Sequence, residues 1–557
     1  MVVNVFTDEL ERADVLIEDG KIIGVGDYYT DKDADVAEDL SGKVICPGFI
    51  DGHIHIESSF LTPYEFARAC VPHGTTTVIA DCHEIANVCG ADGINYMIEA
   101  SRGLPLDVYF AIPSCVPATD FDEAGARLEA ADIEPFFSNP CVVGLGEVMN
   151  YVGVIYNDQR VLDKVNCALW NDLTVNGHAP LVSGKELDKY VSAGIRDDHE
   201  CSTLEEAKER IRKGQKVMIR QGTAARNLQM LLPLFEEPWS RHCMLVCDDK
   251  HPADITSNGH IDEIIRLAVR GGKSPIVAIR MATIQAAQHF ALNNIGAVAP
   301  SYQADLVVLD GLDTLRVCDV YKNGKRVYEN GKMHDFPTPQ IDPRLDRIVR
   351  NSFHIDELKK EDFIINETGK RMCRVIKLVE NQLLTDELIT EIDFDKDNGI
   401  DISRDILKLA VLERHNNTGH KGVGFINGIS MEYGAIAASV SHDSHNLIVI
   451  GTNEDDMVAV ANRIRELGGG MAAAYKGEVI AEMPLPIAGI MTDAPADIAA
   501  QQNEAVRESV YSLGADDFVA PFMTMAFVSL PVIPHLKMTT NGLFDVDKFR
   551  PVPLIVD

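Results

Sequence analysis

The chain has 557 residues, 85 acidic against 51 basic side chains and a formal net charge of −34. This length predicts two to four domains, and 46% hydrophobic with 24% charged residues is the composition of an ordinary globular protein. So acidic a chain repels a phosphate backbone, which argues against nucleic acid as a partner. No apolar run approaches the roughly 18 residues that a membrane helix needs, and the first ten residues lack the pattern of a signal peptide. We therefore expect a cytoplasmic protein without a membrane partner.

Two segments, residues 1–46 and 301–345, contain short alternating strands separated by tight turns. The Asp-Gly pair at 19–20 and the Asn-Gly pair at 323–324 are the dipeptides that two-residue hairpins favour. Because the two segments flank a long middle region, we predict that they form one small β-sandwich into which another domain is inserted.

The middle region, residues 47–300, alternates strand and helix signals. Helical patterns at 204–213 and 261–270 lie between or after short apolar runs that recur every 20–35 residues or so. The runs are 44–50, 76–80, 108–112, 142–145, 173–175, 194–195, 217–219 and 244–246. Strand–helix units in this number over about 250 residues predict an α/β fold, a TIM-type (β/α)8 barrel. The sixth run is the weakest.

Residues 350–557 show a different pattern. An amphipathic helix is predicted at 455–467, ended by the three glycines at 468–470. Strand-like runs at 447–450 and 478–481 surround it. We predict a separate C-terminal α+β domain.

Histidines and carboxylates follow several of the predicted barrel strands. In such a barrel the active site lies at the carboxyl ends of the strands. His53 and His55 are alternate residues, so on a strand they point to the same side. The complete set of candidate ligands is His53, His55, Glu147, His178, His199 and one of the two aspartates after the eighth run, Asp248 or Asp249. These nitrogen and oxygen donors are sufficient for two divalent ions with open positions for water.

Several segments resemble a known family. Residues 47–55, Pro-Gly-Phe-Ile-Asp-Gly-His-Ile-His, resemble the strand-one motif of the amidohydrolase superfamily. More narrowly, His-Ile-His-Ile-Glu-Ser-Ser at 53–59 and His-Glu-Ile-Ala-Asn-Val at 83–88 are similar to the bacterial adenine deaminases, as are 419–422 and 441–446. The resemblance covers nearly the whole chain.

The resemblance implies hydrolysis of adenine to hypoxanthine and ammonia, a step of purine salvage, by hydroxide generated on a binuclear metal centre. His53 and His55 would bind the first ion, His178 and His199 the second, and Glu147 would bridge them. Imidazole and carboxylate ligands suit Mn²⁺, Fe²⁺ and Zn²⁺ alike. The resemblance favours Mn²⁺ or Fe²⁺ and leaves Zn²⁺ possible. Relatives of this kind associate, so a dimer or larger homo-oligomer is expected.

The resemblance also suggests which residues move protons. Asp248 would bind metal and transfer protons, with its neighbour Asp249 as the competing assignment. Purine N1 must gain a proton, and Glu84 or His83 is the candidate donor, with Glu200 in reserve. Because Glu200 directly follows a ligand, a strand would point it away from the metals, and we interpret it mainly as structural.

Other polar residues carry weaker hypotheses. Arg220 contacts the purine, closes a loop, or forms an ordinary salt bridge. Ser58 and Ser59 line the pocket, or Ser58 caps a following helix, which is the interpretation we favour. His442 and His445 either belong to the core or surface or lie on a loop that reaches an active site.

Two other functions fit the same residues. One is the same chemistry on another substrate, as in a hydantoinase, a dihydroorotase, or a guanine or cytosine deaminase. The other is a catalytically inactive homologue that serves as a binding protein. An adenine assay separates the first, and metal analysis separates the second.

Overall fold

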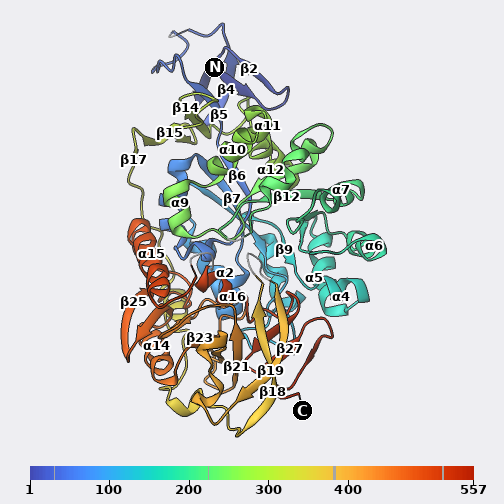
Figure 1. Cartoon of the computed structure of the whole chain (residues 1–557). Helices are drawn as coiled ribbons and strands as arrows, with labels where there is room; N and C mark the ends of the chain where they lie inside the picture. The colour runs from blue at the N-terminus through green and yellow to red at the C-terminus, as the bar shows by residue number, and fades with distance from the viewer. Residues whose placement is uncertain (31, 224, 380–383, 517–519, 557) are drawn as a thin grey trace. The chain divides into compact units, whose positions relative to one another are not determined.

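The computed structural model describes residues 1–556 except 31, 224, 380–383 and 517–519. It consists of two compact units. Figure 1 shows the whole chain, coloured by residue number. The first comprises Met1–Cys82, Met97–Ser114 and Glu129–Gln340; the second comprises His83–Tyr96, Cys115–Leu128 and Ile341–Asp557. The units interleave along the chain, and the domain boundaries given above stay a prediction.

Eight parallel strands form the centre of the first unit. They are β6 Phe49–Ile54, β7 Thr75–Asp81, β8 Asp107–Ile112, β9 Val142–Val148, β10 Thr174–Gly177, β11 Asp197–Asp198, β12 Lys216–Arg220 and β13 Cys243–Val246. One sheet has the order β10-β9-β8-β7-β6 and the other β11-β12-β13. The Arg196 N–H donates to the Val175 oxygen at 3.0 Å on one side, and the Asp248 N–H donates to the His53 oxygen at 3.0 Å on the other. The strands therefore close on themselves, which confirms the predicted (β/α)8 barrel.

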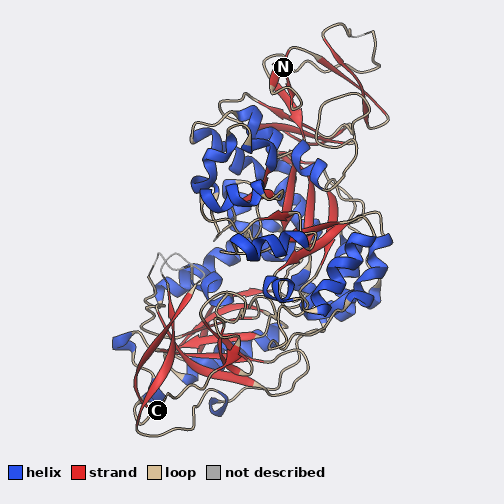
Figure 2. Cartoon of the chain, turned by 90° about the vertical axis from the view of Figure 1, so that its right-hand side faces the viewer, coloured by secondary structure: helices blue, strands red, loops and turns tan. Residues whose placement is uncertain are grey.

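Helices surround these strands (Figure 2). They are α1 Pro63–Cys70, α3 Ala130–Ile133, α4 Tyr151–Tyr156, α5 Gln159–Trp170, α6 Gly184–Ser192, α7 Leu204–Arg212, α8 Leu228–Leu231, α9 Pro252–Asn258, α10 Ile261–Arg270, α11 Pro275–Met281 and α12 Ile284–His289. The helices predicted at 204–213 and 261–270 are α7 and α10. In α10, Ile261, Ile264, Ile265 and Ala268 are buried, which is the spacing of one apolar helix face.

Two strand predictions were wrong in detail. The run 44–50 contains two strands, because the chain leaves β5 (Val44–Pro47) before β6 begins at Phe49. Gly48 makes this transition, and a Cβ there would lie 2.1 Å from the Thr76 hydroxyl. The sixth strand is Asp197–Asp198 rather than 194–195. Its two aspartates are buried, so an apolar pattern did not mark it.

The two flanking segments form the predicted β-sandwich. One layer is a seven-stranded sheet in the order β17-β16-β15-β14-β5-β1-β2, and the hairpin β3–β4 packs on it through a shared apolar core. The strands are β1 Val2–Asn4, β2 Glu9–Glu11, β3 Asp14–Glu18, β4 Lys21–Gly26, β14 Leu306–Leu309, β15 Val317–Lys322, β16 Lys325–Glu329 and β17 Lys332–Met333. Asp19 and Gly20 have φ of 49° and 78°, and Asn323 and Gly324 have 49° and 72°, as the predicted hairpin turns require.

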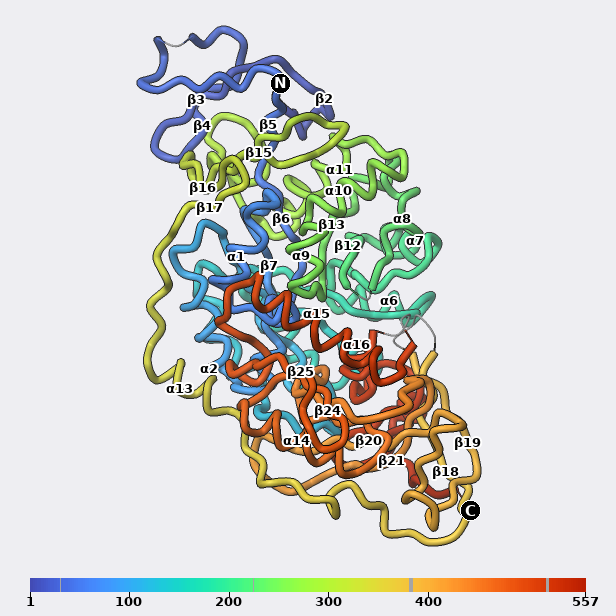
Figure 3. Tube along the Cα trace, turned by 60° about the vertical axis from the view of Figure 1, so that its left-hand side comes forward, coloured from blue at the N-terminus to red at the C-terminus, as the bar shows by residue number. Residues whose placement is uncertain are grey.

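The second unit contains an eight-stranded sheet in the order β19-β18-β21-β20-β23-β22-β24-β25. Helix α14 packs on it through a buried apolar cluster, and the two lie together in Figure 3. The elements are β18 Lys370–Leu378, β19 Thr385–Asp393, β20 Leu407–Leu412, β21 Lys421–Asn427, β22 Ala435–Ala438, β23 Leu447–Gly451, α14 Glu454–Leu467, β24 Gly470–Tyr475 and β25 Glu478–Pro484. Also here are most of α2 (His83–Ala100), α13 Pro343–Arg350, α15 Ala496–Ser512, α16 Pro521–Ala526, β26 Leu536–Thr539, β27 Gly542–Asp545 and β28 Arg550–Pro551. The predicted helix and strands near 447–481 are confirmed.

Within the described residues, no helix combines the length and the apolar character needed to cross a membrane.

Candidate metal centre

Six predicted ligands lie at the carboxyl ends of barrel strands. His53 lies in β6 and His55 just after it, Glu147 lies near the end of β9, His178 follows β10, His199 follows β11, and Asp248 lies two residues beyond β13. All six are buried, none more than 8% exposed. Strand closure therefore brings together residues separated by almost 200 positions.

Glu147 stands between two pairs of histidines. Its Oε1 lies 3.1 Å from His55 Nε2 and 4.0 Å from His53 Nε2. Its Oε2 lies 2.6 Å from His178 Nδ1 and 3.2 Å from His199 Nε2. Each carboxylate oxygen thus faces one pair, which is the arrangement needed to connect two neighbouring cations.

Asp248, rather than Asp249, faces the histidines. Its Oδ1 lies 3.2 Å from His55 Nε2 and 3.6 Å from His53 Nε2. Its backbone φ is 63°, a left-handed conformation that aspartate adopts more readily than most residues. Asp249 instead accepts a hydrogen bond from the Ser58 hydroxyl at 2.6 Å. Ser58 lies within the short helix Ile56–Ser59 and caps nothing, so the expectation of a helix cap was wrong.

Asp81, the last residue of β7, orients two members of the cluster. Its Oδ2 accepts the Glu147 N–H at 2.8 Å, and its backbone oxygen lies 3.0 Å from His55 Nδ1. A carbonyl can only accept, so His55 Nδ1 carries the proton and Nε2 presents its lone pair to the site. A Cβ on Gly146 would lie 2.2 Å from Asp81 Oδ2, so a glycine is required there.

Asp51 connects the strands on either side of the barrel closure. Its Oδ1 accepts the N–H of His53 at 3.2 Å and that of Cys247 at 3.1 Å. The side chain is fully buried, and burial raises the pKa of Asp51 to about 7. One carboxylate oxygen therefore fixes the backbone at a ligand on β6 and at the residue before a ligand beyond β13.

The donor set fits divalent cations. His53 Nε2 is buried and accepts or donates no hydrogen bond among the described residues, although carboxylate oxygens lie 3.6 and 4.0 Å away. Burial disfavours a charged His199, but surrounding carboxylates outweigh burial and hold the pKa of His199 well above its usual value. Imidazole and carboxylate donors that crowd together in a buried site are what a divalent ion would organise.

Glu200 also faces the cluster, contrary to expectation. Its Oε1 lies 3.4 Å from His199 Nε2 and 3.6 Å from His178 Nδ1. The prediction assumed that strand alternation continues beyond His199, but β11 ends at Asp198. Arg220, the last residue of β12, forms the salt bridge considered above, because its two terminal nitrogens donate to Glu200 and Asp248.

His83 and Glu84 begin α2 and lie in the second unit. The Glu84 carboxylate pairs with His442 Nδ1 at 2.6 Å and with His445 Nε2. Burial alone would raise the pKa of Glu84, but these histidines hold it well below its usual value. The Ser441 N–H donates to His445 Nδ1 at 3.2 Å, so His445 Nε2 bears the proton directed at Glu84. Sequence analysis missed this pairing, since its partners are some 360 positions apart.

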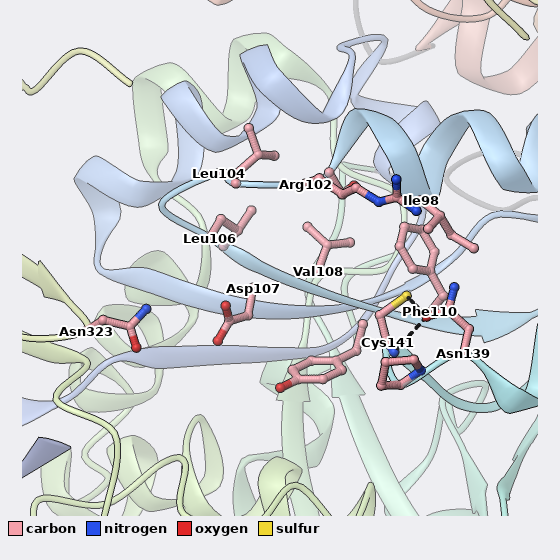
Figure 4. A pocket seen from close by; sticks show the side chains of 14 residues that line it. Ile98, Arg102, Leu104, Leu106, Asp107, Val108, Phe110, Asn139, Cys141 and Asn323 are labelled. Carbon is pink, nitrogen blue, oxygen red and sulfur yellow. Dashed lines mark hydrogen bonds between the residues drawn. The ribbon is translucent and has the colours of Figure 1, made fainter. Parts of the chain in front are cut away.

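A cavity of about 530 Å³ in the first unit lies elsewhere (Figure 4). Asp107 and Val108 at the start of β8, and Asn139 and Cys141 before β9, line it. These are the amino ends of the strands, opposite to the ligands. It contains none of the candidate ligands.

Comparisons with known proteins agree with this geometry. The amidohydrolase family model matches residues 44–333, and the adenine deaminase C-terminal domain matches 382–550. An adenine deaminase of Desulfatibacillum aliphaticivorans is 44% identical across 99% of this chain and 95% of its own length. "Adenine deaminase 2" of Carboxydothermus hydrogenoformans is also 44% identical over the same shares, and the Clostridium acetobutylicum adenine deaminase is 42% identical over 99% and 95%.

The barrel, its strand-end cluster and the first family match define an amidohydrolase. Together with the C-terminal match and relatives of this identity, they show that the chain belongs to the adenine deaminase family.

Proposed function

We propose that this protein hydrolyses adenine to hypoxanthine and ammonia in purine salvage. The observation that carries the proposal is the similarity of both domains, over 99% of the chain, to curated adenine deaminases. The buried cluster of histidines and carboxylates at the carboxyl end of the barrel supports it.

His53 and His55 would hold one divalent ion, His178 and His199 a second, and Glu147 would share its two oxygens between them. The distances from Glu147 to both pairs support this division. When bound, such ions supply a nucleophile at neutral pH by lowering the pKa of water. Mn²⁺, Fe²⁺ and Zn²⁺ all suit these donors, and the set contains no thiolate that would favour zinc.

Asp248 would accept a proton from the attacking water. Its Oδ1 faces His53 and His55, whereas Oδ2 accepts a hydrogen bond from Arg220 at 2.7 Å. A carboxylate held in this way has one oxygen available for proton transfer to the leaving amine. Arg220 Nε is buried without a hydrogen-bond acceptor among the described residues. This N–H could donate a hydrogen bond to the purine, which supports a role for Arg220 in substrate binding.

His83 and Glu84 remain the candidates for the proton that purine N1 gains. Both follow the end of β7 within three residues. The lowered pKa of Glu84 keeps its carboxylate ionised, which suits a hydrogen-bond acceptor. Of the two, His83 is therefore the better proton donor, and Glu84 is the better substrate contact.

The experiment measures ammonia release from adenine, guanine, cytosine and hydantoin by purified protein supplied with Mn²⁺, alongside metal content per chain. We expect release from adenine alone and about two ions per chain, as a two-ion site requires. His178→Asn should lose one ion and most activity, whereas His242→Asn, at an exposed histidine of the same unit, should lose neither. Two bound ions without release from adenine would refute the substrate, and less than one ion per chain would indicate an inactive binding homologue.

A further inference from the structure

Three charged side chains form a continuous chain across the carboxyl ends of neighbouring strands. Glu200 lies two residues beyond β11, Arg220 is the last residue of β12, and Asp248 lies two residues beyond β13. Arg220 Nη1 donates to Glu200 Oε1 at 2.6 Å and Nη2 donates to Glu200 Oε2 at 2.9 Å. The same Nη1 donates to Asp248 Oδ2 at 2.7 Å.

The environment of this triad makes stability a poor explanation for it. The side chains of Glu200, Arg220 and Asp248 are 12%, 11% and 6% exposed. Removing three charges from water costs about as much as their attraction returns. Nearby, Asp248 has left-handed backbone geometry, and its carboxylate takes part in the candidate centre.

We infer that Arg220 is a positioning residue for Asp248 and that Glu200 is a positioning residue for Arg220. The bidentate salt bridge with Glu200 fixes the plane of the Arg220 guanidinium. Arg220 then fixes Oδ2 of Asp248, which leaves Oδ1 directed at His53 and His55.

Glu200 also lies close to the other half of the cluster. Its Oε1 lies within 3.6 Å of His178 Nδ1 and His199 Nε2. The triad thus connects the side of the cluster that Asp248 faces with the side that holds the second histidine pair.

The test compares Arg220→Gln, Arg220→Lys and Glu200→Gln in the full chain, and rests partly on the proposed function. Mn²⁺ affinity of the metal-free protein is measured by competition with a fluorescent chelator, and kcat and KM are measured with adenine. We expect Arg220→Gln to weaken Mn²⁺ binding and lower kcat by about 10–100-fold, the usual effect of losing a residue that orients a ligand. Loss of the proposed contact between Arg220 Nε and the purine would raise KM as well, so the falls in kcat and in Mn²⁺ affinity are the readouts of positioning. Arg220→Lys keeps the positive charge but loses the bidentate geometry of the guanidinium. Its Mn²⁺ affinity and kcat should therefore lie between those of Arg220→Gln and wild type.

Arg280→Gln is the matched control. Arg280 is a buried arginine of the same unit, with a side chain 2% exposed against 11% for Arg220. It donates hydrogen bonds to Asp8 and to the Ser240 hydroxyl. It should lower Tm and leave Mn²⁺ affinity unchanged.

A double-variant cycle tests the order of dependence. If Glu200 acts through Arg220, the double variant Glu200→Gln/Arg220→Gln should bind Mn²⁺ no more weakly than Arg220→Gln alone. Four outcomes would each overturn the inference. They are additive losses of Mn²⁺ affinity in the double variant, wild-type Mn²⁺ affinity in Arg220→Gln, an effect of Arg220→Gln confined to a rise in KM, and an equal loss of Mn²⁺ affinity in Arg280→Gln. The Mn²⁺ measurements remain decisive if adenine proves not to be the substrate.

Discussion

Single carboxylate oxygens in and beside the cluster make distinct contacts. Glu147 turns one oxygen to each histidine pair, and Asp248 turns one toward histidines and one toward Arg220. Asp51 uses a single oxygen to fix two backbone amides. An amide in place of any of these carboxylates keeps its shape but replaces one acceptor oxygen with a donor, so substitution to Asn or Gln tests each oxygen's role.

The neighbouring aspartates give the sharpest test of this kind. Asp248→Asn keeps the shape of the side chain but cannot accept a proton, so kcat with adenine should fall by about 10²–10⁴-fold. Asp249→Asn retains an acceptor for the Ser58 hydroxyl and should stay close to wild type. Both are measured at saturating Mn²⁺ with metal content determined. The reverse pattern would assign the role to Asp249.

Sequence reasoning identified the six candidate ligands because each lies at or directly beyond the end of a strand that an apolar run predicted, or close to it. It misjudged Glu200, whose orientation depends on a strand only two residues long. It could not pair Glu84 with His442 and His445, because nothing local in the chain encodes a contact between segments so far apart.

Among elements, strands with a regular apolar pattern and helices with a single apolar face were predicted well. Helix α10 was found at its predicted bounds. The prediction for strand β11 was misplaced by a few residues. The strand consists of two buried aspartates, which hydrogen bonds such as that from Asn176 to Asp197 at 2.7 Å satisfy, so no apolar pattern marks it. The run 44–50 was read as one strand, since an apolar pattern does not reveal that the chain passes from one sheet to another at Gly48.

Strand β26 supplies a prediction about pH. Lys537 is fully buried, and burial lowers its pKa from 10.5 to about 7. Between pH 7 and pH 10.5, Lys537 is protonated in the unfolded chain and neutral in the folded chain. The free energy of unfolding therefore rises with pH over this range. The slope is at most about 1.4 kcal/mol per pH unit, and it vanishes below pH 7, where both states are protonated.

Replacing Lys537 with Met should remove this slope and raise the stability at pH 7, where burial of the ammonium is most costly. Calorimetric Tm of wild type and Lys537→Met is compared at pH 7 and pH 9.5. The difference should shrink as pH rises. Lys377→Met, at an exposed lysine on β18, should show a difference independent of pH. A constant difference for Lys537→Met would mean that the side chain is not titrating in this window.

At the scale of the whole molecule, the chain interrupts one domain to build another. Strand β5 pairs with β14 in antiparallel register, Pro47 opposite Leu306 and Val44 opposite Leu309. The entire barrel lies between these partners in sequence. Sequence analysis predicted this insertion from the two flanking hairpin signals. It had no signal that residues 83–96 and 115–128 belong to the second unit.

This register carries a consequence for synthesis. At 5–20 residues per second, the ribosome needs roughly 15–50 s to reach β14 after it has made β5, and for that time one edge of β5 has no partner. We expect nascent chains stalled before residue 300 to be cleaved by protease within the first 46 residues, and chains stalled well beyond 345 to resist. Early resistance would mean that the amino-terminal strands fold without β14. Strands made before the barrel would then complete their sheet only after the barrel has been made, and the length of the barrel sets the delay.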